Sequence, residues 1–379
     1  MSVRSVLVVL ATSTALAVGG TALLPPRATG SVAAAPEWGP VTTLAPTTRG
    51  ESLAVAPDGA VTVVWATTGT TPGQVVARHR PAGGSWGAAE VIGHGYAPRV
   101  TADETGDVTA VWLTQSRGRT DGVAAARRPA GGTWSRPTHL SRDREVPGYR
   151  PGSEDVFGAT QLDLAAGAGG QVAVVWAWGS AGRDRPWRVQ AVRRPAGGPW
   201  GHPVAVTPAD WSSAPQVGVD AGGTTVVAWG RQPFGHPQKL LAREHRPGTG
   251  WTSPDTVASQ GYAPELAVDR AGEAVLAYST DDAAVAAAVK PAGGTWESPQ
   301  RLSPAGVEVG DFALATNGAG ASVVALGRSG GRVDVVDRAV GGAWTAPDPV
   351  VRSQAPVYDV LVALDDAGDT FLGWGAYGL

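Results

Sequence analysis

The sequence predicts an all-β fold, a seven-bladed β-propeller in which the N-terminal strand joins the C-terminal blade. A Gly-rich turn closed by Trp alternates with an apolar hairpin along the chain, and each unit occurs seven times. The period is about 48 residues, which suits a radial array of short strands. The 53 Gly and 30 Pro among 379 residues interrupt the chain too often for a helical bundle.

The turn unit is clearest at Arg80–Trp86, which reads Arg-Pro-Ala-Gly-Gly-Ser-Trp. Similar turns precede Trp134, Trp200, Trp251, Trp296 and Trp344. Trp38 keeps the residues that follow the Trp but not the turn before it. One step between these Trp residues is longer than the others because it contains the insertion Arg142–Phe157. The turn therefore marks one fixed point in every blade.

Each repeat predicts four strands, which we call A to D. Strand A alternates small apolar residues, as at Val217–Val219, and ends in a Gly turn. Strand B is continuously apolar, as at Val172–Trp176, and is expected to be buried on both faces. Strand C precedes the Arg-Pro turn, as at Val75–Ala77, and strand D follows the Trp, as at His139–Ser141. Four strands in each of seven repeats indicate the propeller.

The ends of the chain predict how the ring closes. The seventh copy of the hairpin ends close to Leu379, and Trp38–Leu44 begins the repeats as a strand D without a blade. We expect this segment to complete the last blade, so that residues 36–379 form a single domain. Strand C of that blade has no full copy. Val32–Ala35 could supply it, but the same residues are also the expected cleavage site, and we favour cleavage and a three-stranded closing blade.

Residues 1–35 are predicted to be a secretory signal peptide. Arg4 is followed by the apolar stretch Val6–Leu24 and by small residues at Ser31–Ala35. The alternative is a retained membrane anchor, since the stretch is nearly long enough to span a bilayer. With cleavage we expect a secreted, extracellular protein with no stable membrane insertion.

Composition narrows the function classes. The net charge of −3 gives no general attraction to nucleic acid, so no nucleic-acid partner is predicted. The chain has no Cys, and its six His residues lack metal-ligand spacing, so no metal site is expected. It also lacks a P-loop and a Gly-x-Ser-x-Gly elbow. We therefore assign no catalytic residue and no cofactor, and expect a monomer.

The turn unit resembles the Asp-box hairpin of sialidases and related BNR-repeat propellers. Gly131, Thr133 and Trp134 match the end of that motif, whereas its Asp and Ser positions hold Pro129 and Arg127. The chain is also similar to secreted seven-bladed lectins, which carry a Trp in each repeat. The resemblance implies a shared blade framework, and by analogy a carbohydrate ligand.

The two faces of the propeller differ in how well they suit ligand binding. One face carries the short A–B and C–D turns, which present a ring of cationic residues: Arg80, Arg128, Arg194, Arg246, Lys290 and Arg338. Acidic residues recur in the neighbouring turns, at Asp58, Asp103, Asp220, Asp269 and Asp365. An anionic polymer could bind such a ring, but ion pairing between adjacent turns is the simpler expectation. We expect the Trp of each turn unit to pack between blades.

The opposite face carries B–C and D–A loops that vary in length and composition, and binding usually resides on such loops. Two long loops flank the third blade, and aromatic rings beside charged groups suit sugars. The candidate ligand-binding residues are Tyr149, Phe157, Trp178, Arg183, Asp184, Arg185, Trp187 and Trp211.

The sequence therefore predicts a secreted, non-enzymatic propeller that binds a glycan or an extracellular protein through this face. One alternative is a sialidase-like glycoside hydrolase or lyase, and another is a structural cell-envelope protein. Two carboxylates that converge near the central axis would favour the enzyme.

Overall fold

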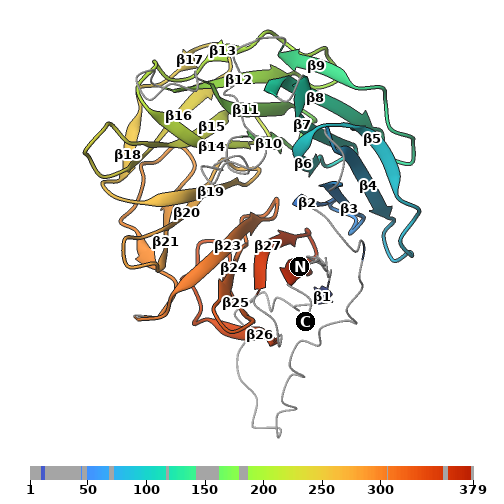
Figure 1. Ribbon diagram of the computed structural model, residues 1–379. Coiled ribbons are helices and arrows are strands. Elements are labelled where there is room, and N and C mark those ends of the chain that lie inside the picture. Colours follow the sequence, from blue (N-terminus) through green and yellow to red (C-terminus); the bar gives the residue numbers. More distant parts are fainter. Residues whose placement is uncertain are drawn as a thin grey trace, which may run out of the picture.

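The protein is an all-β propeller in which sheets follow one another radially around a central axis (Figure 1). The computed structural model describes residues 10–12, 44, 49–67, 72–116, 119–141, 162–178, 187–304, 306–352 and 357–376. Every structural statement below concerns these residues. None of the elements in this part is a helix long and apolar enough to cross a bilayer.

The first three sheets each contain four antiparallel strands. The first sheet is β2 (Arg49–Val55), β3 (Val61–Ala66), β4 (Gln74–Arg80) and β5 (Glu90–His94). The second is β6 (Tyr96–Ala102), β7 (Val108–Ser116), β8 (Arg119–Arg128) and β9 (Thr138–Ser141). The third is β10 (Leu162–Ala166), β11 (Val172–Trp178), β12 (Arg188–Arg194) and β13 (Val204–Ala205).

The next three sheets repeat the pattern, with one extra short strand in the fourth. The fourth sheet is β14 (Ser212–Val219), β15 (Thr225–Arg231), β16 (Lys239–Arg246), β17 (Gly250–Trp251) and β18 (Asp255–Ala258). The fifth is β19 (Tyr262–Val268), β20 (Ala274–Ser279), β21 (Val285–Lys290) and β22 (Gln300–Arg301). The sixth is β23 (Val309–Thr316), β24 (Ser322–Arg328), β25 (Arg332–Arg338) and β26 (Asp348–Arg352).

The expectation of a seven-bladed propeller is wrong, since only six sheets in the described part of the chain have the four strands of a complete blade. Six sheets have four or more strands, whereas the last sheet has three, in the order β1 (Leu10–Thr12), β28 (Thr370–Ala376) and β27 (Val357–Leu364). The described part of this sheet contains the hairpin of β27 and β28 but not the two outer strands that a turn unit supplies in the other sheets. The strand beside β28 is β1, which lies inside the predicted signal segment. We had expected Trp38–Leu44 to complete this sheet instead.

Apolar side chains from adjacent sheets form the core. Seven clusters are present in the described part of the chain, one at each junction between neighbouring sheets, including the junction of the last sheet with the first. The largest fully buried side chains are Trp112, Trp176 and Trp229, which all lie on the second strand of their sheets. This burial confirms strand B as the centre of each blade.

The Trp of each turn unit packs between blades, as predicted. Each one lies against the cluster between its own sheet and the preceding sheet. Trp134, for example, packs on the cluster between the first and second sheets, and Trp200 on the next cluster. These tryptophans are therefore part of the framework.

Leu44 lies at the junction between the last sheet and the first. Its side chain is buried in the cluster that contains Phe371 of β28 and Val63 of β3. Its carbonyl oxygen accepts a hydrogen bond from Arg78 Nη1 at 3.2 Å. Val206, which like Leu44 stands six residues after a framework Trp, accepts the same kind of bond from Arg243 at 2.7 Å. The other residues of Trp38–Leu44 lie outside the described part.

The ring of cations on the A–B and C–D face is engaged within the protein. Arg80 and Arg194 lie over the rings of Trp86 and Trp200, at 5.7 and 5.4 Å from the ring centres. Lys290 is buried against Glu244, and the buried Arg338 pairs with Glu273 of the neighbouring sheet. Ion pairing therefore holds for Lys290 and Arg338, whereas Arg80 and Arg194 contact aromatic rings instead.

Acidic residues of the A–B turns stabilise the turns themselves. Oδ1 of each of four aspartates accepts a hydrogen bond from the backbone N–H four residues later: Asp103, Asp220, Asp269 and Asp365. Asn317 makes the same contact in the sixth sheet. The turns thus have a structural role at equivalent positions.

Candidate functional site

Only part of the predicted loop site lies in the described part of the structure. Trp178, Trp187 and Trp211 are described. The other candidates lie outside it, namely Tyr149, Phe157, Arg183, Asp184 and Arg185. A ligand role for all eight residues stays a prediction.

Trp178 belongs more to the framework than to an open surface. It ends β11, is half-buried, and packs against the cluster between the second and third sheets. The guanidinium carbon of Arg188, its partner in the strand register, lies 4.6 Å from the centre of its ring. Since the core and a cation both contact the ring, little of it is available for stacking on a ligand.

Trp187 and Trp211 lie close together where the third sheet meets the fourth. The carbonyl oxygen of Trp187 accepts hydrogen bonds from the backbone N–H groups of Asp210 and Ser212, at 3.1 and 3.2 Å. Trp211 stands between these two donors and has a positive φ of 67°. Such a conformation is strained for a residue with a Cβ, and the two flanking bonds hold it. Both tryptophans are partly exposed.

Charged and aromatic groups surround this pair. Arg231 Nε lies 2.9 Å from Asp210 Oδ2, and the Ser212 hydroxyl also contacts the Asp210 carboxylate. Gln232 N donates to the Trp211 carbonyl at 3.3 Å, which joins this turn to the loop that carries Phe234. Phe234 is 93% exposed. Two partly exposed Trp residues, an ion pair and the loop with an exposed Phe are therefore joined through the backbone at one junction.

A second candidate site lies on the propeller axis. A cavity of about 410 Å³ is lined by the inner strands of all seven sheets. Its charged lining residues in the described part of the chain are Glu51, Arg99, Asp163, Glu265, Asp311 and Asp359. Five carboxyl groups therefore share this channel with a single guanidinium.

Bulges in the inner strands direct several of these side chains. The register shifts in strand A of six sheets, and a residue with positive φ stands at the shift in most of them. Ala97, Ala214 and Ala263 are such residues, and each is followed by Pro. A bulge inserts an extra residue and reorients the side chains beside it. It therefore changes which side chains of a mostly apolar strand face the axis.

The channel makes its acids hard to ionise. Burial, reinforced by the charges of Asp163 and Asp311 and opposed by Arg99, raises the pKa of Glu265 to about 8. Burial also raises the pKa of Asp163 to about 6, although Val217 N donates to its carboxylate at 2.8 Å. Burial and the nearby Glu51 and Asp311 raise the pKa of Asp359 to about 6. Near neutral pH the channel therefore combines a protonated acid with ionised ones.

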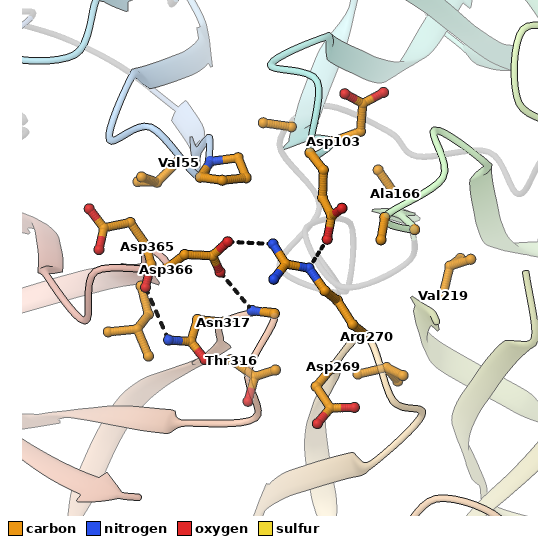
Figure 2. A pocket seen from close by; sticks show the side chains of 18 residues that line it. Val55, Asp103, Ala166, Val219, Asp269, Arg270, Thr316, Asn317, Asp365 and Asp366 are labelled. Atoms are coloured by element: carbon orange, nitrogen blue, oxygen red, sulfur yellow. Dashed lines mark hydrogen bonds and ion pairs between the residues drawn. The ribbon is translucent and has the colours of Figure 1, made fainter. Parts of the chain in front are cut away.

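Arg270 bridges the channel at the A–B turn end (Figure 2). Its guanidinium forms ion pairs with Glu104 of the second sheet and with Asp366 of the last sheet. Asp366 also accepts a hydrogen bond from Gly318 N at 3.1 Å, and Asn317 Nδ2 donates to the Asp365 carbonyl at the same distance. Turns from four sheets are thereby connected across the axis at this end of the channel.

Sequence reasoning missed the channel site. Of the acids that could have met in a cleft, Asp210, Asp281 and Asp282 do not line the channel. The others, Glu145, Glu154, Asp155 and Asp184, lie outside the described part of the chain. The available signal was a charged or amide residue four positions before the A–B turn, as at Arg99, Asp163, Gln216 and Glu265. Such a residue is unexpected in an inner strand that is otherwise apolar.

Comparison with known proteins supports the fold alone. No protein-family model and no curated relative matches the sequence. AofleA from Arthrobotrys oligospora aligns with a TM-score of 0.51 and 11% identity, over 80% of this chain and 86% of that chain. A mutant of the Aleuria aurantia lectin in complex with Fucα1-6GlcNAc aligns with a TM-score of 0.50 and 12% identity, over 81% and 96%. Another structure of that lectin, a six-bladed propeller, gives a TM-score of 0.48 at 12% identity, over 81% and 96%. The resemblance to Asp-box repeats therefore rests on the turn residues alone.

Proposed function

We propose that this protein is a carbohydrate-binding propeller whose site lies on the variable-loop face, where the third sheet meets the fourth. The observation that carries the proposal is that the backbone of Trp187 is hydrogen-bonded to the residues on both sides of Trp211, next to the Asp210–Arg231 ion pair. An indole face covers the C–H groups of a sugar ring, and planar charged groups take its hydroxyls in pairs. The propeller lectin from Aleuria aurantia, which is similar in fold, offers further support.

A glycan array with the purified protein tests this proposal, and Fucα1-6GlcNAc is a natural first probe because the similar lectin was crystallised with it. Trp211→Ala and Phe234→Ala should each weaken binding of any glycan found by about tenfold or more. Val340→Ala is the control, since Val340 is also an exposed apolar residue but lies in a turn of the sixth sheet. Equal effects of all three substitutions would contradict the site, and an array with no bound glycan would contradict the function.

We also propose that the ring is closed by Trp38–Leu44. Leu44 supports this, because its burial and its bond from Arg78 repeat those of Val206 in a complete blade. In that arrangement the segment provides the outer strand of the last sheet. A strand that joins both ends of the chain also protects a sheet edge that would otherwise be open.

Export is a separate proposal, supported by the signal-like composition of residues 1–35. Cleavage there would remove β1 from the mature chain. Mass spectrometry of the protein from the culture medium tests this: a mature N-terminus near Pro36 is expected, and an intact Met1 in the cell membrane would contradict it.

One observation favours the hydrolase alternative. Carboxyl groups do converge on the axis, and the high pKa of Glu265 beside the lower one of Asp163 separates an acid from a base. A panel of chromogenic glycosides between pH 5 and 8 decides between the functions. Turnover that Glu265→Gln abolishes would replace the binding proposal, and turnover of no substrate would leave the loop face as the functional surface.

A further inference from the structure

Among the described residues that line the axial channel, acidic groups outnumber basic ones. Its five carboxyl groups face one cation, Arg99, which also donates to the carbonyl of Pro98 at 3.2 Å. Arg99 lowers the pKa values of Asp163, Glu265 and Asp359 but does not offset the effect of burial on any of them. Like charges that line one cavity repel one another, so a cation that enters the channel is stabilised.

Two polar side chains in the channel make no hydrogen bond to the side chains that the structure describes. Gln216 is 6% exposed and lines the cavity, and its amide makes no hydrogen bond to any described residue. The Glu265 carboxyl likewise accepts no hydrogen bond within the described part of the chain. Buried amides and carboxyls are normally satisfied. An amide oxygen and a carboxylate that face the same cavity therefore indicate a ligand that donates hydrogen bonds.

The arrangement suits an organic cation better than a metal ion. Within the described residues, no three His, Cys, Asp or Glu side chains lie close enough together to hold a metal. The carboxyl groups come instead from different sheets around the axis. Half-buried leucines separate them on the wall, namely Leu53, Leu314 and Leu361. Spaced acids with apolar surface between them match ammonium groups joined by methylene segments. A cavity of about 410 Å³ is also within the size range of small-molecule sites.

We propose that the axial channel binds a small organic cation that carries primary or secondary ammonium groups. Asp163, Glu265 and Asp359 supply the negative charge, and the Gln216 amide oxygen accepts one N–H. The ligand enters from the variable-loop end, since Arg270 bridges the other end. This site is independent of the proposed glycan site at Trp187 and Trp211.

Binding of a cation should release protons. Below pH 8 the Glu265 carboxyl is mainly protonated in the folded protein. A cation beside it favours the carboxylate and lowers its pKa, as it does for Asp163 and Asp359. The charged groups that already act on Glu265 are Asp163, Asp311 and Arg99, and a bound ammonium adds to the effect of Arg99. Ligand binding near pH 7.5 therefore displaces protons into the buffer.

Isothermal titration calorimetry with spermidine on the purified protein tests the proposal. Titrations at pH 7.5 in two buffers of different ionisation enthalpy should show saturable binding at one site with net proton release. Glu265→Gln should remove most of that release, and at pH 8.5 it should weaken binding by about tenfold. The matched control is Asp255→Asn, which removes one charge from an exposed position on β18 and should change neither quantity.

Three results would overturn the proposal. The first is absence of saturable spermidine binding, and the second is an equal effect of Asp255→Asn and Glu265→Gln, which would indicate adsorption to the surface. The third is binding of Ca²⁺ that competes with spermidine at similar affinity, which would make the channel a metal site. A glycan array that fails while spermidine binds would contradict only the loop-face function, so the two proposals are tested separately.

Discussion

Glu265→Gln should make the protein more stable at alkaline pH and should have little effect at acidic pH. Burial raises the pKa of this carboxyl from 4.5 to about 8, so the folded state holds its proton more tightly than the unfolded state does. A carboxyl of this kind contributes stability that is fully present below pH 4.5 and is lost as the pH rises through 8. Glutamine keeps the size and the hydrogen-bonding capacity of the side chain but has no proton to lose.

The expected difference follows from the size of that change. Each tenfold change in proton affinity corresponds to about 1.4 kcal/mol, so the upper limit is about 5 kcal/mol between pH 4 and pH 9. Glu265 is partly accessible from the channel, and water there screens the charge. We therefore expect the variant to gain about 2 to 3 kcal/mol over the wild type at pH 9, and less than about 0.5 kcal/mol at pH 4.5.

Chemical denaturation at pH 4.5, 7 and 9 measures this difference, with Asp255→Asn as the control for loss of one surface charge. A stability difference between Glu265→Gln and wild type that does not change with pH would refute the reasoning. It would mean that Glu265 ionises in the folded protein as it does in the unfolded chain.

Three further predictions test the framework. Trp176→Ala removes a fully buried indole from strand B and should lower the free energy of unfolding by about 3 to 5 kcal/mol. Trp187→Ala should lower it by less than about 1 kcal/mol. Thermal melts compare the two variants, and equal losses would show that Trp187 belongs to the core. Arg270→Ala should cost about 1 kcal/mol, because its two ion pairs are partly solvated, and the cost should shrink in 1 M NaCl; a cost that persists at high salt would contradict an electrostatic role. If Leu44 belongs to the closing blade, Leu44→Ala should lower the free energy of unfolding by about 2 to 4 kcal/mol. Leu140→Ala, at the equivalent position of the second sheet, should lower it by as much. A loss of stability in Leu140→Ala alone would contradict closure by this segment.

Repetition made the blades predictable. Strand B at Val172–Trp178, the edge strand at Thr138–Ser141 and the packing of Trp134 all follow from signals that recur in other copies. Each copy of a repeated motif can be compared with the other copies, so one ambiguous segment does not change the predicted strand. The last sheet was harder because its outer strands have no repeat copy, and the pairing of Leu10–Thr12 with β28 has no counterpart in the periodic pattern.

The loop site was predictable in location but not in detail. The third and fourth sheets do bring Trp187 and Trp211 together through the Trp187 carbonyl. The sequence could not indicate that Arg188 would cover Trp178, because that contact depends on the strand register at Trp178 and Arg188. Nor did it single out Phe234, whose exposure depends on how far its loop projects.

The channel was missed because its residues are distributed one or two to a blade. A search for chemistry looks for acids at short spacing, whereas Asp163 and Glu265 are separated by about a hundred residues and by one complete sheet. Radial symmetry is what brings them together, since equivalent positions of strand A all face one axis. The position four residues before the A–B turn holds Arg99, Asp163, Gln216 and Glu265 in four consecutive blades, and small or apolar residues in the others: Ser52, Ala313 and Leu361. Comparing the same position across all copies, instead of scanning along the chain, would have exposed the polar arc on one side of the axis. The regularity that makes a repeat protein easy to recognise therefore also predicts its axial site, provided that the departures from the repeat are compared at equivalent positions.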